Sequence, residues 1–473
     1  MSDQSNQTTY WKSLNELAQN EEYKKYVERE FPENATEMTD QVSRRSFLRV
    51  MGASIALAGF ASCRKPVQKI TPYVRQPENM VLGEPLYYAT AMPFQDTATG
   101  LLVETHEGRP TKIEGNEEHA GSMGGTNIYN QAAVLGLYDP DRSRSPRLNG
   151  ESATKDDFVN FAADHFSDRS RSILFISEEN SSPTYNRLKS DLLNNFENAE
   201  WTTFEPFSEN NAIEGVRMAF GQRLRTVNHY GEADLVVSLD DDFMSPQGHK
   251  NSVQYAFELA QRRRVMSTED GMSRFYCVEN AYTNTGSFAD HRLKLKSSAI
   301  APFTFALAAR LSENVEGLDA FSNVNNAFSG HEWVDKLAQE LLENSGSSIL
   351  SVGMQHGPEV HAAVAAINLA LENTGNTVTY HELPYREDNN ASTALVDAVN
   401  RLNDGEFDTV VLVGTNILYS APADLNVEGA LQNADTTIHL SEYVDETSKD
   451  VNWHVNRAHF LSSWGDGYSF TGQ

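Results

Sequence analysis

The stretch DTVVLVGTN, residues 408–416, places five consecutive apolar or β-branched residues directly before a glycine and two polar residues. A short apolar run without alternation is typical of a strand buried on both faces, as in a parallel sheet covered by helices. Three other runs have the same form, and all lead into polar or glycine-containing turns: SILFIS (172–177), ADLVVSL (233–239) and SSILSVG (347–353). Together these runs predict the α/β class.

Amphipathic segments follow several of these runs, among them NSVQYAFELAQRRR (251–264) and HAAVAAINLALEN (361–373). Alternating buried strands and helices predict doubly wound parallel sheets. Ligands of such sheets bind outside the carboxyl ends of the strands, so the residues after each run are the candidates for chemistry.

Three strand ends carry such candidates. Asp240, Asp241 and Asp242 follow the second run, and they fit either a divalent-cation site or a solvated acidic loop. The loop is favoured because three successive side chains rarely point at one atom. The turn Gly414-Thr415-Asn416 is the best polar turn for a nucleotide phosphate or ribose, although these residues also fit an ordinary turn.

The remaining strand end, residues 353–358, reads GMQHGP. Its two glycines permit close approach of the backbone to a ligand. However, it has neither the Gly-x-Gly-x-x-Gly spacing of a dinucleotide site nor the Lys-Ser/Thr of a P-loop, so both of these assignments are weak.

The residues before the α/β part have a different sequence pattern. GLLVETHEGRPTKIEGNEEH (100–119) alternates around the turn residues 107–110 and predicts a β-hairpin. QAAVLGLYDPDR (131–142) predicts a helical segment that ends at Asp139-Pro140. Residues 64–99 are proline-rich and aperiodic in their first part, and we expect an extended linker there.

Cysteine and histidine content limits the metal chemistry. The chain has two cysteines, Cys63 and Cys277, which is too few for an iron–sulfur cluster held by four thiolates. Cys277 lies in the apolar run RFYCVEN, which predicts an inert buried thiol. His454, His459 and Asp466 could form a metal or acid–base group, but scattered histidines are more often surface or core residues.

The net charge of −28 argues against a nucleic-acid partner, because phosphate contacts require clustered lysine and arginine. An acidic, solvated surface explains such a charge. An acidic face that steers a basic redox partner or contacts a basic subunit is the alternative.

The amino-terminal region predicts export. After a leader (1–40) with the pattern of an amphipathic helix, residues 41–63 contain the twin-arginine signal, with Ser43, Arg44, Arg45, Phe47 and Leu48 as its motif residues. The apolar run behind the signal has about fourteen uncharged residues, whereas about twenty are needed to span a bilayer. We therefore interpret the run as part of an export signal and not as a membrane anchor.

Cys63 ends this run after Phe60-Ala61-Ser62, which is similar to a lipoprotein processing site. Acylation of Cys63 by two or three chains would anchor the protein stably at the periplasmic face of the cytoplasmic membrane. In the alternative, an ordinary signal peptide, Cys63 has no role.

Five motifs occur in the order seen in molybdopterin oxidoreductases: EGRPTKIEGN, QAAVLGLYDPDR, ENAYTNTGSFADHRLKLKSSAIAPFTFALA, VGTNILYSAP and DETSKDV…NRAHFLSSWGDG. The chain resembles this family over nearly everything after residue 85. With the leader, the twin arginines and Cys63, it is similar to the amino-terminal half of the iron–sulfur subunits of bacterial alternative complex III, a quinol:electron-acceptor oxidoreductase.

The resemblance implies a molybdopterin-oxidoreductase-like α/β fold in which a small β-rich hairpin domain (100–150) precedes doubly wound domains at 151–330 and 331–473. Catalytic members of the family carry an iron–sulfur cluster on the hairpin domain, but the segments flanking this hairpin contain no cysteine. Asp240, Asp241 and Asp242 replace the Gly-polar-Asn of catalytic members beside an anionic cofactor with two pyrophosphates. The resemblance thus implies a fold without its own cofactor.

The function implied is that of a non-catalytic scaffold in a membrane-bound quinol-oxidising respiratory complex. Its partners would include multihaem cytochrome and integral membrane subunits. Iron–sulfur clusters would lie only in a carboxyl-terminal, ferredoxin-like portion beyond residue 473 or in a partner.

Two alternatives remain. One is an active molybdopterin-dependent oxidoreductase fragment in which Gly414, Thr415 and Asn416 contact the cofactor. The other is a stand-alone exported binding protein.

Overall fold

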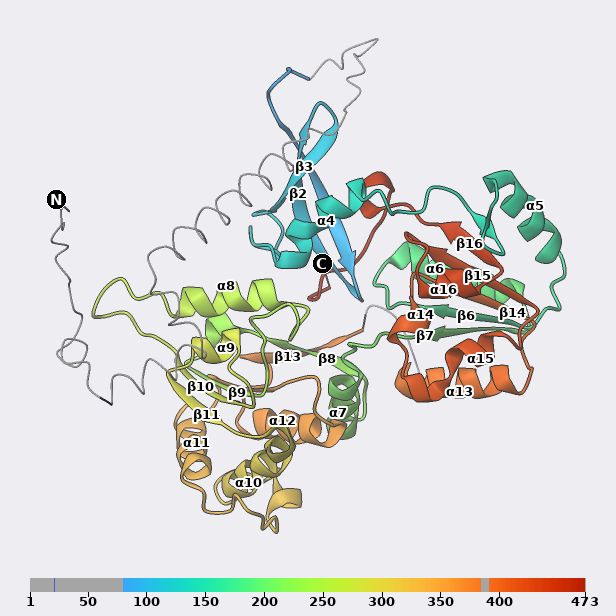
Figure 1. The fold of residues 1–473 in the computed structure, drawn as a ribbon. Coiled ribbons are helices and arrows are strands. Elements are labelled where there is room, and N and C mark those ends of the chain that lie inside the picture. The colour runs from blue at the N-terminus through green and yellow to red at the C-terminus, as the bar shows by residue number, and fades with distance from the viewer. Residues whose placement is uncertain (1–20, 22–79, 384–390, 473) are drawn as a thin grey trace, which may run out of the picture. The chain divides into compact units, whose positions relative to one another are not determined.

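The computed structural model describes residue 21, residues 80–383 and residues 391–472 (Figure 1). The chain divides into two compact units, Met1–Glu78 and Asn79–Gln473. The export signal with Ser43, Arg44, Arg45, Phe47 and Leu48, and the candidate lipidation site Cys63, lie outside the described residues. Among the helices that are described, none combines the length and the apolar composition needed to cross a bilayer.

The second unit alternates strands and helices along most of its length. The strands are β1 Leu86–Phe94, β2 Thr97–His106, β3 Arg109–Gly115, β4 Arg147–Leu148, β5 Glu151–Ser152, β6 Ile173–Ser177, β7 Ala199–Thr203, β8 Leu224–Asn228, β9 Leu235–Leu239, β10 Arg274–Glu279, β11 His291–Lys294, β12 Ser348–Val352, β13 Val378–Glu382, β14 Thr409–Val413, β15 Thr436–Ser441 and β16 Trp453–Asn456. The helices are α4 Ile128–Tyr138, α5 Lys155–His165, α6 Pro183–Asn195, α7 Asn210–Phe220, α8 Ser252–Arg262, α9 Asn284–Ser287, α10 Ile300–Ser312, α11 Glu332–Glu343, α12 Pro358–Ala370, α13 Ala391–Asn403, α14 Ile417–Ser420, α15 Val427–Leu431 and α16 Glu446–Asp450.

The first sheet is a three-stranded antiparallel meander in the order β1-β2-β3. The predicted hairpin is confirmed: Glu107 and Gly108, both with positive φ, make the turn between β2 and β3. Helix α4 covers this sheet and ends at Tyr138, directly before the predicted stop at Asp139-Pro140, because Pro140 cannot continue it. Strand β1 was not predicted: residues 86–94 fall in the expected linker but pair with β2 along their whole length.

The second sheet has seven strands in the order β5-β4-β16-β15-β14-β6-β7, of which β16, β15, β14, β6 and β7 are parallel. From β6 the chain first adds β7 on one side and later adds β14, β15 and β16 on the other. The winding direction therefore reverses between β6 and β14.

The third sheet is parallel throughout, in the order β11-β10-β9-β12. Its winding direction reverses between β9 and β12, because β10 and β11 are added on one side of β9 and β12 is added on the other. Strands β8 and β13 form a separate antiparallel pair. All four apolar runs that predicted the α/β class are strands of the two parallel sheets, which confirms that class.

The two parallel sheets interleave in sequence. Strand β14 pairs with β6, and β12 pairs with β9, so each sheet combines segments from both sides of residue 330. This arrangement differs from the expected consecutive domains 151–330 and 331–473. Hydrophobic patterns identify strands, but strand neighbours are set by pairing over long separations, which the patterns do not encode.

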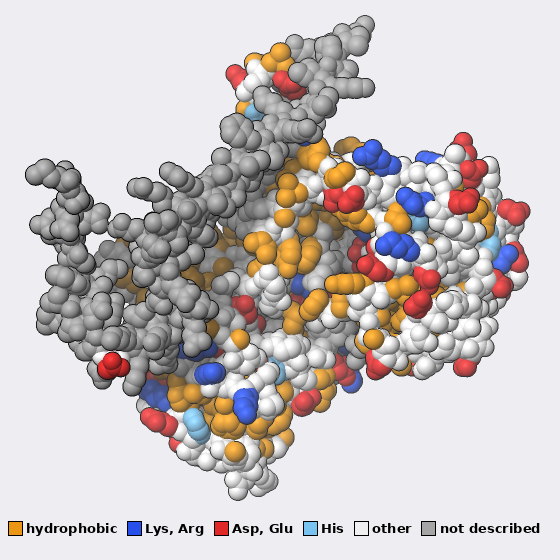
Figure 2. Space-filling view, in the orientation of Figure 1, with side chains coloured by type: hydrophobic (Ala, Val, Ile, Leu, Met, Phe, Trp, Pro, Cys, Tyr) orange, Lys and Arg blue, Asp and Glu red, His pale blue; other side chains and the backbone are white. Residues whose placement is uncertain are grey.

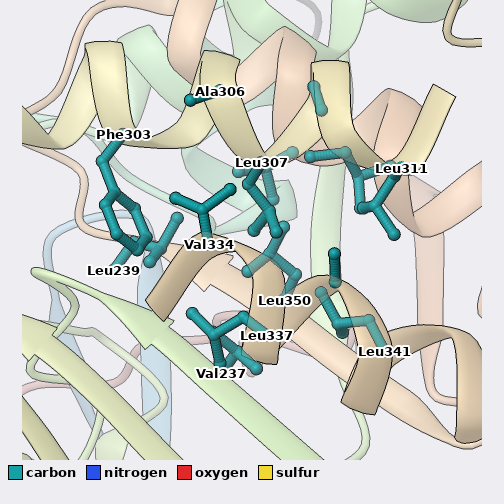
Figure 3. Close-up of a cluster of buried hydrophobic side chains, with 14 of the residues drawn as sticks. Val237, Leu239, Phe303, Ala306, Leu307, Leu311, Val334, Leu337, Leu341 and Leu350 are labelled. Carbon is teal, nitrogen blue, oxygen red and sulfur yellow. The ribbon is translucent and has the colours of Figure 1, made fainter. Parts of the chain in front are cut away.

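Helices cover both faces of the four-stranded sheet (Figure 1). On one face, side chains of β9, β12, α10 and α11 interlock in a hydrophobic core (Figure 3). Nine of its side chains are at most 1% exposed: Val237, Leu239, Phe303, Leu307, Leu311, Val334, Leu337, Leu341 and Leu350. The other face packs on an aromatic cluster with Tyr230, Phe243 and Tyr255. Cys277 lies in this second cluster at 1% exposure, which confirms the predicted buried thiol.

Candidate functional site

The carboxyl edges of the two parallel sheets are the places where this architecture binds ligands, most often where the winding direction reverses. One reversal lies between β9 and β12, whose ends lead into Asp240 and Gly353. The other lies between β6 and β14, whose ends lead into Glu178 and Gly414. These two crevices are the candidate sites.

In the first crevice, Asp240 is buried and surrounded by donors. Its Oδ1 accepts from the backbone N–H of Asn280 (3.0 Å), and its Oδ2 lies 2.9 Å from Nδ2 of Asn280, 3.0 Å from Oγ of Ser297 and 3.2 Å from Nε2 of His356. Burial alone would raise the pKa of Asp240, but the hydrogen bonds, led by that of His356, outweigh it and lower the pKa to about 2. This strand end therefore carries a fixed negative charge.

The next two aspartates are also held by the protein. Asp241 is 6% exposed, and burial raises its pKa to about 7, with Asp242 and Asp240 adding to the effect. Oδ1 of Asp242 accepts from the backbone N–H (3.0 Å) and the hydroxyl (2.7 Å) of Thr285. The expected solvated loop is thus wrong, because Asn280 after β10, Thr285 of α9 and His356 after β12 enclose these residues.

Gly353 closes the first crevice by close packing. Its backbone N–H donates to the carbonyl of Leu239 (3.1 Å), and a Cβ at this position would lie 2.1 Å from the carbonyl oxygen of Asp240. Nε2 of Gln355 donates to that same oxygen (2.7 Å). The absence of a side chain at Gly353 therefore lets its backbone pack against the backbone of Asp240, and not against a ligand.

In the second crevice, an ion pair covers the turn after β14. Nη1 of Arg457, which follows β16, lies 2.6 Å from Oε1 of Glu178. Gly414 has φ +81°, and a Cβ there would lie 2.5 Å from Oε1 of Glu178 and 2.7 Å from Nη1 of Arg457. Burial opposes the charged form of Arg457, but Glu178 raises its pKa overall.

Thr415 and Asn416, the other two residues of the predicted polar turn, are also packed against other parts of the protein. Thr415 is 7% exposed. Nδ2 of Asn416 donates to Oε2 of Glu446 (2.7 Å), and its Oδ1 accepts from the hydroxyl of Thr447 (2.8 Å). The structure brings Gly414, Thr415 and Asn416 to the carboxyl end of β14, where Asn416 contacts α16.

His454, His459 and Asp466 bind separate partners. His454 contacts the hydroxyls of Ser143 (2.7 Å) and Ser448 (2.9 Å). His459 contacts the carbonyl of Ala133 (3.1 Å), and Asp466 accepts from the hydroxyl of Thr184 (2.6 Å). Within residues 80–383 and 391–472, no group of three or more histidine, cysteine or acidic side chains has an arrangement that could hold a metal ion.

Two cavities adjoin the crevices. A small one of about 80 Å³ lies beside Asp241 and is lined also by His249, Arg225 and His361. Nε2 of His361 is buried without a hydrogen-bond partner among the described residues, and burial lowers its pKa to about 4. A groove of about 860 Å³ runs past Glu178 and Arg457 between β1, α4, α6 and the carboxyl-terminal segment 457–466.

A buried ionic network joins the modules that surround these crevices. Asp96, in the turn between β1 and β2, binds Arg225 of β8, and its Oδ1 lies 2.5 Å from Nζ of Lys250. Lys250 also contacts Oε2 of Glu179, which follows β6 (3.0 Å), and Nε of Arg225 lies 3.3 Å from Oε2 of Glu209. All five side chains are at most 8% exposed.

Burial affects the protonation of Glu179 in this network. It raises the pKa of Glu179 to about 8, although Lys250 opposes the shift. Sequence reasoning missed the network because the contacts that join Asp96, Lys250 and Glu179 span 71 to 154 residues, and no local motif marks them.

No protein-family model matches the sequence, and no curated protein matches it. Among solved structures, the fold is similar to that of acetylene hydratase from Pelobacter acetylenicus, with a TM-score of 0.58 and 13% identity. The match covers 78% of this chain and 62% of acetylene hydratase, so the chain spans less than two thirds of that protein. A formyltransferase/hydrolase complex from Methylorubrum extorquens aligns at a TM-score of 0.44 and 13% identity, over 67% of this chain and 87% of the other.

Glu179 predicts a pH dependence of stability. Its pKa is about 8 in the folded protein and near 4.5 when unfolded, so the folded state binds the extra proton between these values. The free energy of unfolding therefore falls as pH rises from about 4.5 to about 8, and Glu179→Gln should reduce this fall by on the order of 1–3 kcal/mol. Urea unfolding at pH 5 and pH 8 measures it.

The control is Glu313→Gln, which changes an exposed carboxylate. It should leave the pH dependence as in the wild type. Equal pH dependence in the wild type and Glu179→Gln would show that Glu179 is ionised in the folded protein.

Proposed function

We propose that this chain is the non-catalytic scaffold portion of a membrane-bound quinol-oxidising respiratory complex, with a molybdopterin-oxidoreductase fold that holds no cofactor of its own. The family resemblance and the parallel-sheet architecture support the fold assignment. The chemistry of the two crevices supports the absence of a cofactor, and this is the observation on which the proposal rests.

The cofactor that the resemblance implies is a polyanion with two pyrophosphates, and the residues at the strand ends do not fit it. Asp240 places an ionised carboxylate at the end of β9. The hydrogen-bond donors around this carboxylate already bind it, so they are not free to bind a phosphate. At the end of β14, the Glu178–Arg457 pair occupies the space over Gly414. A carboxylate 4 Å from a phosphate charge costs about 4 kcal/mol at the effective dielectric of a protein surface.

The amino-terminal sequence supports a location at the periplasmic face of the membrane. The motif around Arg44 and Arg45 would direct export, and acylated Cys63 would hold the protein at the periplasmic face of the membrane. There it would contact multihaem cytochrome and integral membrane subunits. Iron–sulfur clusters of the complex would belong to a carboxyl-terminal portion or to a partner, because four thiolates are needed for each cluster.

The alternative is an active molybdopterin-dependent oxidoreductase fragment. The position of the groove at the β6/β14 reversal favours it, because this is where ligands of the architecture bind. In that case Gly414, Thr415 and Asn416 would contact the cofactor after the Glu178–Arg457 pair had moved away.

Metal analysis distinguishes the two. The exported protein, purified from cells supplied with molybdate and tungstate, should contain far less than one atom of molybdenum or tungsten per chain. In a titration followed by calorimetry, pyrophosphate should not bind to it at millimolar concentration. A near-stoichiometric content of either metal would establish the enzyme and contradict the scaffold.

Membrane attachment tests the proposed location. Cys63→Ser should move the protein from the membrane fraction to the soluble periplasmic fraction when it is produced without other subunits, because the acyl chains are lost. The matched control is Cys277→Ser, which changes the buried thiol and should leave the distribution unchanged. Membrane retention of Cys63→Ser would rule out the lipid anchor.

A further inference from the structure

We propose that the groove beside β1 binds an extended, apolar segment of a partner protein that carries at least one lysine or arginine, and that this segment adds to the free edge of β1 as a further strand. The proposal is independent of the proposed respiratory function, because it depends only on the edge, the apolar lining and the charges of the groove.

The free edge of β1 supplies the backbone partner. Among the described strands, β1 pairs only with β2, so its other side offers unpaired backbone groups. Five consecutive residues of β1, Thr90 to Phe94, line the groove. Side chains of a strand alternate between faces, so a cavity lined by consecutive residues runs along the edge and not over one face. The nine residues of β1 include no charged side chain that would discourage pairing. Pro93 has no backbone N–H, so a partner strand would accept hydrogen bonds from the residues of β1 that precede it.

The lining of the groove supplies apolar contacts. Phe94 and Tyr129 stack with their ring centroids 5.1 Å apart, and Leu188 of α6 is half exposed. The indole of Trp464 is fully exposed. Figure 2 shows hydrophobic side chains gathered in the hollow at the centre of the view. Apolar surface of this kind gains roughly 25 cal/mol for each Å² that a partner covers.

The charges of the groove select a basic partner. Arg457 is neutralised by Glu178, and Glu442 lies 3.6 Å from Arg142. Asp466 accepts hydrogen bonds from Ser182 and Thr184 but forms no ion pair within the described part of the chain, so its charge is uncompensated. The hydrogen bonds from Ser182 and Thr184 lower the pKa of Asp466, which keeps it ionised.

A lysine or arginine of the partner would meet two favourable groups here. Asp466 and Trp464 line the same groove two residues apart. A cation held there would pair with the carboxylate and face the indole, and contacts of both kinds are favourable. Main-chain pairing with β1 would supply affinity, as in other cases of strand addition, and this acidic aromatic end would supply specificity.

Peptide binding tests the proposal with the full chain. The probe is a fluorescein-labelled nine-residue peptide of alternating valine and lysine, compared with the same peptide carrying glutamate in place of lysine. Fluorescence anisotropy should show binding of the lysine peptide at least tenfold tighter than that of the glutamate peptide. Methylation of alternate backbone nitrogens should weaken binding at least fivefold in one of the two possible frames, because only one frame directs its N–H groups to β1.

Variants locate the site. Trp464→Ala and Asp466→Asn should weaken the lysine peptide about fivefold and about threefold, respectively. Matched controls are Tyr419→Ala, another exposed aromatic, and Asp191→Asn, an exposed acid of α6 outside the groove; both should bind as the wild type does.

Several outcomes would overturn the proposal. These are failure of the lysine peptide to bind, equal binding of both peptides, insensitivity to backbone methylation, or equal effects of groove and control variants. Dimerisation in sedimentation velocity that Trp464→Ala abolishes would assign the groove to a second copy instead. Peptide binding that appears only after residues 1–79 are removed would assign it to the protein's own amino-terminal segment.

Discussion

The carboxylate of Asp96 is the point at which the modules of this protein meet. It lies in the turn of the hairpin sheet, yet its partners Arg225 and Lys250 belong to the region of the four-stranded sheet, and Lys250 continues to Glu179 at the end of β6. Removing one member of such a buried group leaves an uncompensated charge, which typically costs about 3–5 kcal/mol. The hairpin and both parallel sheets are therefore joined by one buried polar network.

Charged side chains at the two crevices are likewise bound by other residues of the protein. In many α/β proteins the reversal points are open to a ligand, and backbone N–H groups face the site. Here Asp240 binds Asn280, Ser297 and His356, while Glu178 binds Arg457 over Gly414. Other residues of the protein thus bind the polar groups at these strand ends.

Local sequence predicted the parts of this structure that depend on local physics. The apolar runs predicted the buried strands, and the turn at Glu107-Gly108 and the break at Pro140 predicted the ends of β2 and α4. Asp240 was identified as a strand-end residue, but its burial was missed because its donors lie 40 to 116 residues away. The interleaving of the sheets, the ionic network and the groove beside β1 depend on the same long-range pairing.

We expect the buried ionic network to make the modules of the described residues 80–383 and 391–472 one cooperative unit. Scanning calorimetry of the full chain and of Lys250→Met tests it most directly, with Lys336→Met as the control for an exposed lysine. We predict one principal transition for the wild type and the control, and for Lys250→Met a transition that is lower by several degrees and broadened or split. Separate transitions in the wild type that Lys250→Met leaves unchanged would contradict the account.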